Sequence, residues 1–104
     1  MKSSLPWDEM HNINTWNLEY APSITPDGRE LFFTRANGMT HRTRIMHSTR
    51  ASIFEPFGRP QEIASIPEAF VEGPTLTPDG KVLLYHRRVE GTSEMSKLFG
   101  VARP

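Results

Sequence analysis

The stretch A-P-S-I-T-P-D-G at residues 21–28 returns as G-P-T-L-T-P-D-G at residues 73–80, 52 positions later. The likeness continues into the apolar run behind each copy, L-F-F at residues 31–33 and V-L-L-Y at residues 82–85. Self-similarity with a period near 50 residues indicates a repeat architecture.

The T-P-D-G element predicts a tight turn between two strands. Proline presets φ, the aspartate side chain hydrogen-bonds the backbone ahead of it, and glycine adopts the positive φ that closes the hairpin. We therefore expect Asp27 and Asp79 to form turns. A catalytic pair would require two equivalent turns to converge.

The rest of each repeat predicts short strands. Nine prolines and seven glycines, spread along the chain, disfavour long helices. Two expected strands end at residues 23–25 and 75–77. The others cover residues 30–34, 44–48, 61–66, 82–86 and 97–102. The apolar runs at the second strand of each repeat do not alternate with polar residues, so both faces of these strands should be covered.

The expected fold is all-β: a single domain, residues 1–104, with two four-stranded antiparallel propeller-type blades at about residues 15–66 and 67–104. The second blade ends before its own outer strand. We expect residues 6–14, which precede the first blade much as the 61–66 strand precedes the second, to supply that strand to a neighbouring chain.

Two blades do not close a ring, so the chain is expected to form a homo-oligomer. A trimer would hold six blades and is favoured over a dimer or a tetramer. Twelve basic residues balance twelve acidic ones, which gives no reason to expect nucleic acid or an anionic membrane as a partner.

The pattern P-x-[IL]-[ST]-P-D-G followed by an apolar strand resembles the WD40-like β-propeller repeat called PD40, found in TolB-type propellers. Residues 22–28 and 74–80 carry the pattern, and the likeness covers about residues 18–103. The resemblance implies a propeller fold in a family that includes partner-binding proteins and propellers attached to peptidases. No catalytic residue belongs to the repeat itself.

Composition narrows the chemistry and the location of the protein. The chain has no cysteine, which excludes disulfides, thiolate metal sites and a cysteine nucleophile. No apolar run reaches the roughly 18 residues of a membrane-spanning helix, and residues 1–8 lack the apolar stretch of a signal peptide. We expect a cytoplasmic protein, or a periplasmic one if a signal peptide was removed.

Arginines follow the second strand of each repeat and give the best candidates for a binding site. Corresponding loops of stacked blades emerge on one face, so a ring would present a basic rim to an anionic ligand or an acidic protein. Arg35 and Arg87 occupy equivalent positions at the end of a buried strand, and His86 adjoins Arg87. The alternative is that the arginines of these edges pair with Glu30, Glu55, Glu90 and Glu94.

The histidines do not predict a metal site. His41 and His47 are six positions apart, about 20 Å on an extended strand, so they cannot bind one ion from that strand. We expect no cofactor and no metal. The expected function is a non-enzymatic binding or scaffold module with Arg35, His86 and Arg87 as ligand-binding residues. The alternative is a hydrolase or lyase whose site combines symmetry-related chains in a central channel.

Overall fold

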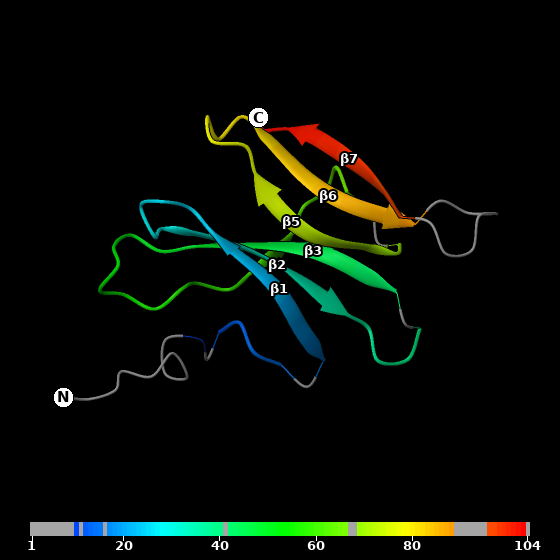
Figure 1. Ribbon diagram of the computed structural model, residues 1–104. Helices are drawn as coiled ribbons and strands as arrows, with labels where there is room; N and C mark the ends of the chain where they lie inside the picture. Colours follow the sequence, from blue (N-terminus) through cyan, green and yellow to red (C-terminus); the bar gives the residue numbers. More distant parts are fainter. Residues whose placement is uncertain are drawn as a thin grey trace.

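The computed structural model describes residues 10, 12–15, 17–40, 42–66, 69–88 and 96–103. These residues form two antiparallel sheets that pack against each other, without a helix in the described ranges (Figure 1). The all-β fold class is therefore confirmed.

The first sheet has four strands in the order β1-β2-β3-β4, and the second has three in the order β5-β6-β7. Their bounds are β1 Leu18–Ile24, β2 Glu30–Ala36, β3 Thr43–Thr49, β4 Gln61–Glu62, β5 Val71–Leu76, β6 Val82–Arg88 and β7 Ser96–Ala102. The strands expected within the two repeats are present. β4 is shorter than expected, because the Ile66 amide donates to the Ile63 carbonyl at 2.9 Å and the chain turns away from the sheet to bury Ile66.

The two T-P-D-G turns have the same construction. In the first, the Thr25 hydroxyl donates to Asp27 Oδ1 at 2.6 Å, and the Arg29 amide donates to the same oxygen at 3.0 Å. In the second, Thr77 and Lys81 donate to Asp79 Oδ1 at 2.7 and 3.0 Å. The role in turn formation expected for the two aspartates is thus present at both places.

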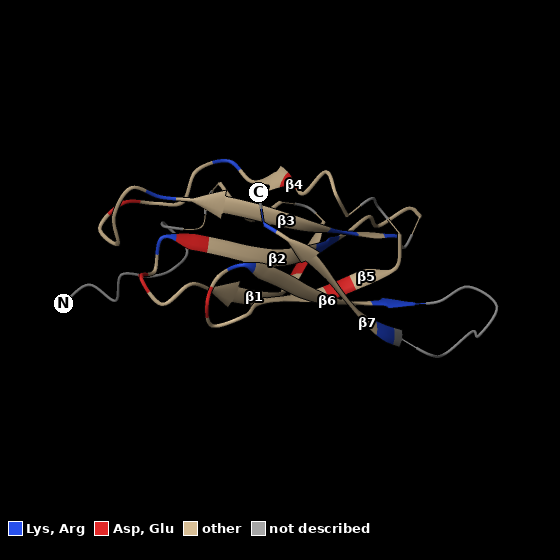
Figure 2. Cartoon of the chain, turned by 90° about the horizontal axis from the view of Figure 1, so that it is seen from above, with Lys and Arg blue, Asp and Glu red and all other residues tan. Residues whose placement is uncertain are grey.

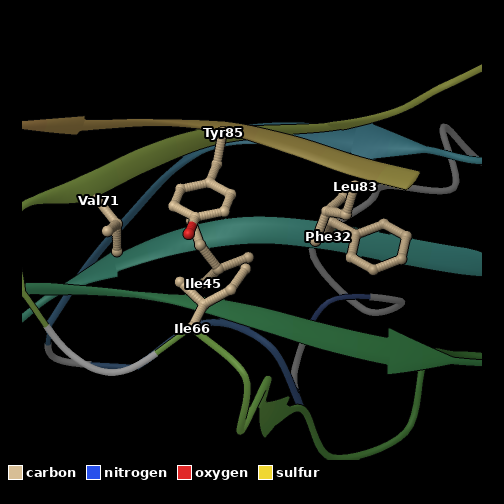
Figure 3. Packing of buried hydrophobic residues seen from close by; sticks show 6 residues of the cluster. All are labelled: Phe32, Ile45, Ile66, Val71, Leu83 and Tyr85. Carbon is tan, nitrogen blue, oxygen red and sulfur yellow. The ribbon is translucent and has the colours of Figure 1, made fainter. Parts of the chain in front are cut away.

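The main core lies between the sheets. It combines Phe32 and Ile45 of the first sheet with Ile66, Val71, Leu83 and Tyr85 (Figure 3). Figure 3 places Ile45 beside Ile66 and Tyr85, and Phe32 beside Leu83. Since these residues belong to both repeats, neither sheet holds this core alone.

A second core covers the side of the first sheet that is turned away from the second sheet, called here the far face of the first sheet. It contains Leu31, Phe33 and Met46, covered by Ile13 and Phe57. The four consecutive residues Leu31–Thr34 are therefore buried, as expected for a strand covered on both faces. In β6 only Leu83 and Tyr85 are buried, so the expectation holds there for one face.

The segment before β1 folds on its own chain. Residues 12 and 13 lie in a turn, and the Ile13 amide donates to the Met10 carbonyl at 2.9 Å. The outer strand expected at residues 6–14 is not seen at residues 10 and 12–14, and its remaining residues lie outside the described part. Its transfer to a neighbouring chain stays a prediction.

β7 ends the second sheet on one side. It pairs with β6 along its whole length, from Ser96 opposite Arg88 to Ala102 opposite Val82, and with no other described strand. The second sheet thus has one strand fewer than the first in the described residues, at the position where the sequence predicts a strand from another chain.

Candidate functional site

Figure 2 marks lysine and arginine residues at both ends of the strands, and one group lies where β6 ends and where β3 and β7 begin. We call Arg42, Arg87, Arg88 and Lys97 the basic end; all four are exposed. Arg87 lies opposite Lys97 in the β6–β7 register. No described carboxylate forms an ion pair with Arg87, Arg88 or Lys97. Glu90 and Glu94, two of the glutamates expected to pair with these arginines, lie outside the described residues.

Two half-exposed aromatic rings lie inside the basic end. The guanidinium carbons of Arg42 and Arg88 lie 5.8 and 5.0 Å from the centre of the Phe70 ring, and that of Arg87 lies 5.7 Å from the centre of the Phe99 ring. Such cation–π contacts orient the guanidinium groups, and those of Arg87 and Arg88 form no ion pair with a described carboxylate.

His86 lies on the opposite side of β6 from Arg87. It pairs with Leu98 across the sheet and is adjacent in register to Glu72 of β5. Its side chain is exposed. His86 is therefore close to the basic end along the strand but points to the far face of the second sheet, which is the face turned away from the first sheet.

Arg35 has a structural role that the sequence did not reveal. Its Nε donates to Glu19 Oε2 at 2.9 Å, and its Nη2 donates to the Ile13 carbonyl at 2.7 Å. The guanidinium also lies 5.4 Å from the centre of the Phe33 ring. Arg35 thus ties the segment before β1 to the first sheet, and within one chain it does not join His86 and Arg87 in a site.

An ion cluster between the sheets was not expected as a site. Arg103 donates to both carboxylate oxygens of Glu30, at 2.6 and 3.2 Å, and His47 Nε2 lies 3.0 Å from Glu30 Oε1. The His47 ring stacks on Phe32 with centroids 4.5 Å apart. The hydrogen bonds from Arg103 and then from His47 lower the pKa of Glu30. The pairing of an arginine with Glu30, which was the alternative reading, is present here.

A hollow of about 490 Å³ lies between the two T-P-D-G turns, bordered by Asp27, Asp79 and Arg103. The Thr25 hydroxyl lowers the pKa of Asp27, and the Lys81 amide lowers that of Asp79. Each carboxylate thus has local partners in its own turn. No group of three or more histidine or acidic side chains in the described ranges has the geometry of a metal site. His11 and His41 lie outside those ranges.

The first and second sheets also meet through equivalent residues. Tyr20 of β1 donates to Glu72 Oε2 of β5 at 2.8 Å, and these two residues are 52 positions apart, the period of the repeat. Burial, followed by the hydrogen bond to Glu72, raises the pKa of Tyr20 to about 12. Equivalent positions of the two repeats therefore lie side by side along β1 and β5.

No known protein family, curated protein or solved structure matches this chain. Among the described residues, no helix has the length and apolar character needed to span a membrane.

Proposed function

We propose that this protein is a non-enzymatic binding or scaffold module of partial β-propeller type that holds an anionic ligand or an acidic protein segment at its basic end. Arg87 is the central contact of this proposal, with Arg88 and Lys97 around it and His86 at its margin. Arg35 is no longer included as a ligand contact, because it already binds Glu19 and Ile13.

One observation carries the proposal: exposed cations that aromatic rings hold in place and that no described carboxylate neutralises. Oriented guanidinium groups match carboxylates and phosphates in geometry and charge. No observation on the described residues favours the hydrolase or lyase, so we propose only binding.

The test is the binding of a fluorescein-labelled ten-residue polyglutamate peptide, followed by fluorescence anisotropy at about 0.1 M ionic strength, where the Debye length is about 10 Å. The double variant Arg87→Gln/Arg88→Gln should weaken binding about tenfold, or about 1.4 kcal/mol. Added salt should weaken binding to the parent chain, because it screens the attraction between the arginines and the glutamates of the peptide.

The matched control is Arg29→Gln/Lys81→Gln. These two residues are exposed, occupy equivalent positions after the two T-P-D-G turns at the opposite end of the strands, and carry the same total charge. The control should change affinity less than about twofold, since exposed charges beyond a Debye length contribute little. Equal losses in both variants would show a response to net charge alone and would contradict the proposal.

The proposal also includes assembly. The working form would be a homo-oligomeric ring, in which a trimer supplies six PD40-like blades. It is supported by the side-by-side placement of equivalent residues Tyr20 and Glu72, as expected for neighbouring blades around an axis.

A further inference from the structure

The far face of the second sheet is equivalent, by the repeat, to the face of the first sheet that is buried in the main core. Val82, Leu84 and His86 stand at the positions of Glu30, Phe32 and Thr34, and Leu98 stands at that of Ile45. Phe32 and Ile45 are buried, with the second sheet packed on them. Leu98 is 63% exposed, and Leu84 is only partly buried.

Gly100 shapes this exposed face. It lies opposite Leu84 in the β6–β7 register, and a Cβ atom at Gly100 would lie 3.1 Å from both Leu84 Cδ2 and Val82 Cγ1. Leu84 and Val82 therefore lean over the glycine. Leu98 is left as the prominent apolar side chain of the face.

The complementary feature lies on the far face of the first sheet. There, a hollow of about 190 Å³ has mostly apolar walls, formed in part by Met10, Ile13, Pro22 and Phe33. The repeat-equivalent residues are Ile63, Ile66, Pro74 and Tyr85. Ile66 and Tyr85 lie beside Ile45 in the main core, and Ile63 packs against the same cluster. The hollow thus corresponds to the place that Ile45 fills in the main core. No equivalent side chain fills it among the described residues.

The equivalence extends to the backbone. The Ile13 amide donates to the Met10 carbonyl and the Ile66 amide donates to the Ile63 carbonyl, both at 2.9 Å. Ile24 is 52% exposed beside this face, whereas its equivalent Leu76 packs against the main core. The far face of the first sheet is therefore built to receive a sheet, as the second sheet receives the first.

One part of that face is already filled. Arg50 lies 4.2 Å from the centre of the Phe57 ring, whereas its equivalent Arg103 lies 5.9 Å from the centre of the Phe32 ring. Phe57 thus takes the place that Phe32 takes in the main core. Phe57 is fully buried in its own chain, so a docked sheet would find this part of the face occupied and would place only Leu98 in the hollow.

We infer that the second sheet of one chain docks on the far face of the first sheet of a second copy, with Leu98 in the hollow beside Ile13. The contact is head to tail, so repetition of it closes a ring or continues as a filament. The inference rests on the assembly part of the proposed function and names the surface that makes it.

The first test is solution mass by light scattering after size exclusion, at protein concentrations from about 10 μM to about 1 mM, which cover the dissociation constants of weak to moderate interfaces. The parent should associate to a multiple of the chain mass. Leu98→Glu should remain a monomer or associate at least tenfold more weakly. Met39→Glu, at an 89% exposed position in the β2–β3 turn, is the matched control and should associate like the parent.

The second test fixes the orientation, and it is possible because the chain has no cysteine of its own. Chains carrying Leu98→Cys and chains carrying Pro22→Cys, one of them with a size tag, are mixed and treated with a short thiol–thiol cross-linker. Mixed pairs should form faster than pairs of identical chains. Faster pairing of Leu98→Cys chains with each other would show face-to-face contact and overturn the inference, as would a parent that is monomeric throughout.

These outcomes are separable from those of the peptide titration. Leu98 is exposed, so Leu98→Glu should keep the fold, which circular dichroism checks. Retained peptide binding by a chain that never associates would remove the interface and leave the binding function. Association without peptide binding would remove the binding function and leave the interface.

Discussion

Gly28 and Gly80 occupy the same place in the two turns, both with a φ of 73°, yet their surroundings differ. A Cβ atom at Gly28 would lie 3.0 Å from Ile53 Cγ2, whereas one at Gly80 would meet nothing within 4 Å. Gly80→Val should therefore cost about 1–2 kcal/mol of unfolding free energy from backbone strain alone. Gly28→Val should cost more. Urea denaturation measures both, and equal losses would mean that Ile53 moves aside freely.

Glu30 predicts a pH dependence of stability. Arg103 and His47 lower its pKa in the folded protein, so the carboxylate stabilises the fold above the unfolded-state pKa of about 4.3. That contribution is lost as pH falls through the lower, folded-state pKa. Glu30→Gln should lose about 1–2 kcal/mol at pH 7 and approach the parent in acid. Glu62→Gln, whose Arg44 partner is 3.8 Å away, should change little. Thermal melts from pH 2 to 7 check this, and a constant difference would contradict it.

At the level of single residues, the sequence predicted local roles better than distant ones. The roles of Asp27 and Asp79 follow from their nearest neighbours along the chain and were predicted. Arg35 was expected to bind a ligand. Its partners Glu19 and Ile13 lie 16 and 22 positions away in the sequence, and no local pattern predicts these contacts. The Glu30–Arg103 pair spans 73 positions, so only the stacking of two sheets brings it together.

Among the elements, β7 offers the clearest prediction. The edge of β7 turned away from β6 pairs with no described strand. If residues before Met10 of another chain pair with this edge, its outward-facing amides exchange slowly with solvent in the assembled protein. Deleting residues 1–9, which keeps Met10 and Ile13 for the core of their own chain, should make these amides exchange faster and should leave the β6-facing amides protected. Hydrogen exchange with mass spectrometry or NMR resolves the two sets. Unchanged exchange after the deletion would exclude the strand transfer.

The elements themselves were largely predictable. Turn chemistry and repeated apolar runs predict the β1–β2 and β5–β6 hairpins. The corresponding positions of the third strands in the two repeats predict β3 and β7. Two segments differ: residues 10 and 12–14 do not form the expected outer strand, and the apolar sequence after Glu62 does not extend β4. Burial of Ile66 in the main core competes with strand pairing there, and it prevails because the second sheet lies close enough to cover that side chain.

For the molecule as a whole, the shared core predicts that the two sheets unfold together. Leu83 of the second sheet packs beside Phe32 of the first. Leu83→Ala should cost about 2–5 kcal/mol, and protection of β3 amides should fall with that of β6 amides. Leu18→Ala, at an exposed position, should stay within about 0.5 kcal/mol. Loss of protection confined to the second sheet would mean that the sheets are independent.

The Glu30–His47–Arg103 cluster has a consequence for the fidelity of folding. Two similar repeats in one chain, and many in a concentrated solution, offer wrong partners of nearly the right shape. The equivalents of Glu30 and His47 in the second sheet are Val82 and Gly100. Only the face of the first sheet that packs on the second sheet therefore offers Glu30 and His47 to an arginine. If a first sheet packed where the second sheet packs, it would present Arg50 in place of Arg103. Arg50 already contacts the Gly28 carbonyl and the Phe57 ring. Glu30 would then be desolvated without an arginine partner. The cluster thus distinguishes the packing of a first sheet on a second sheet from the packing of two first sheets.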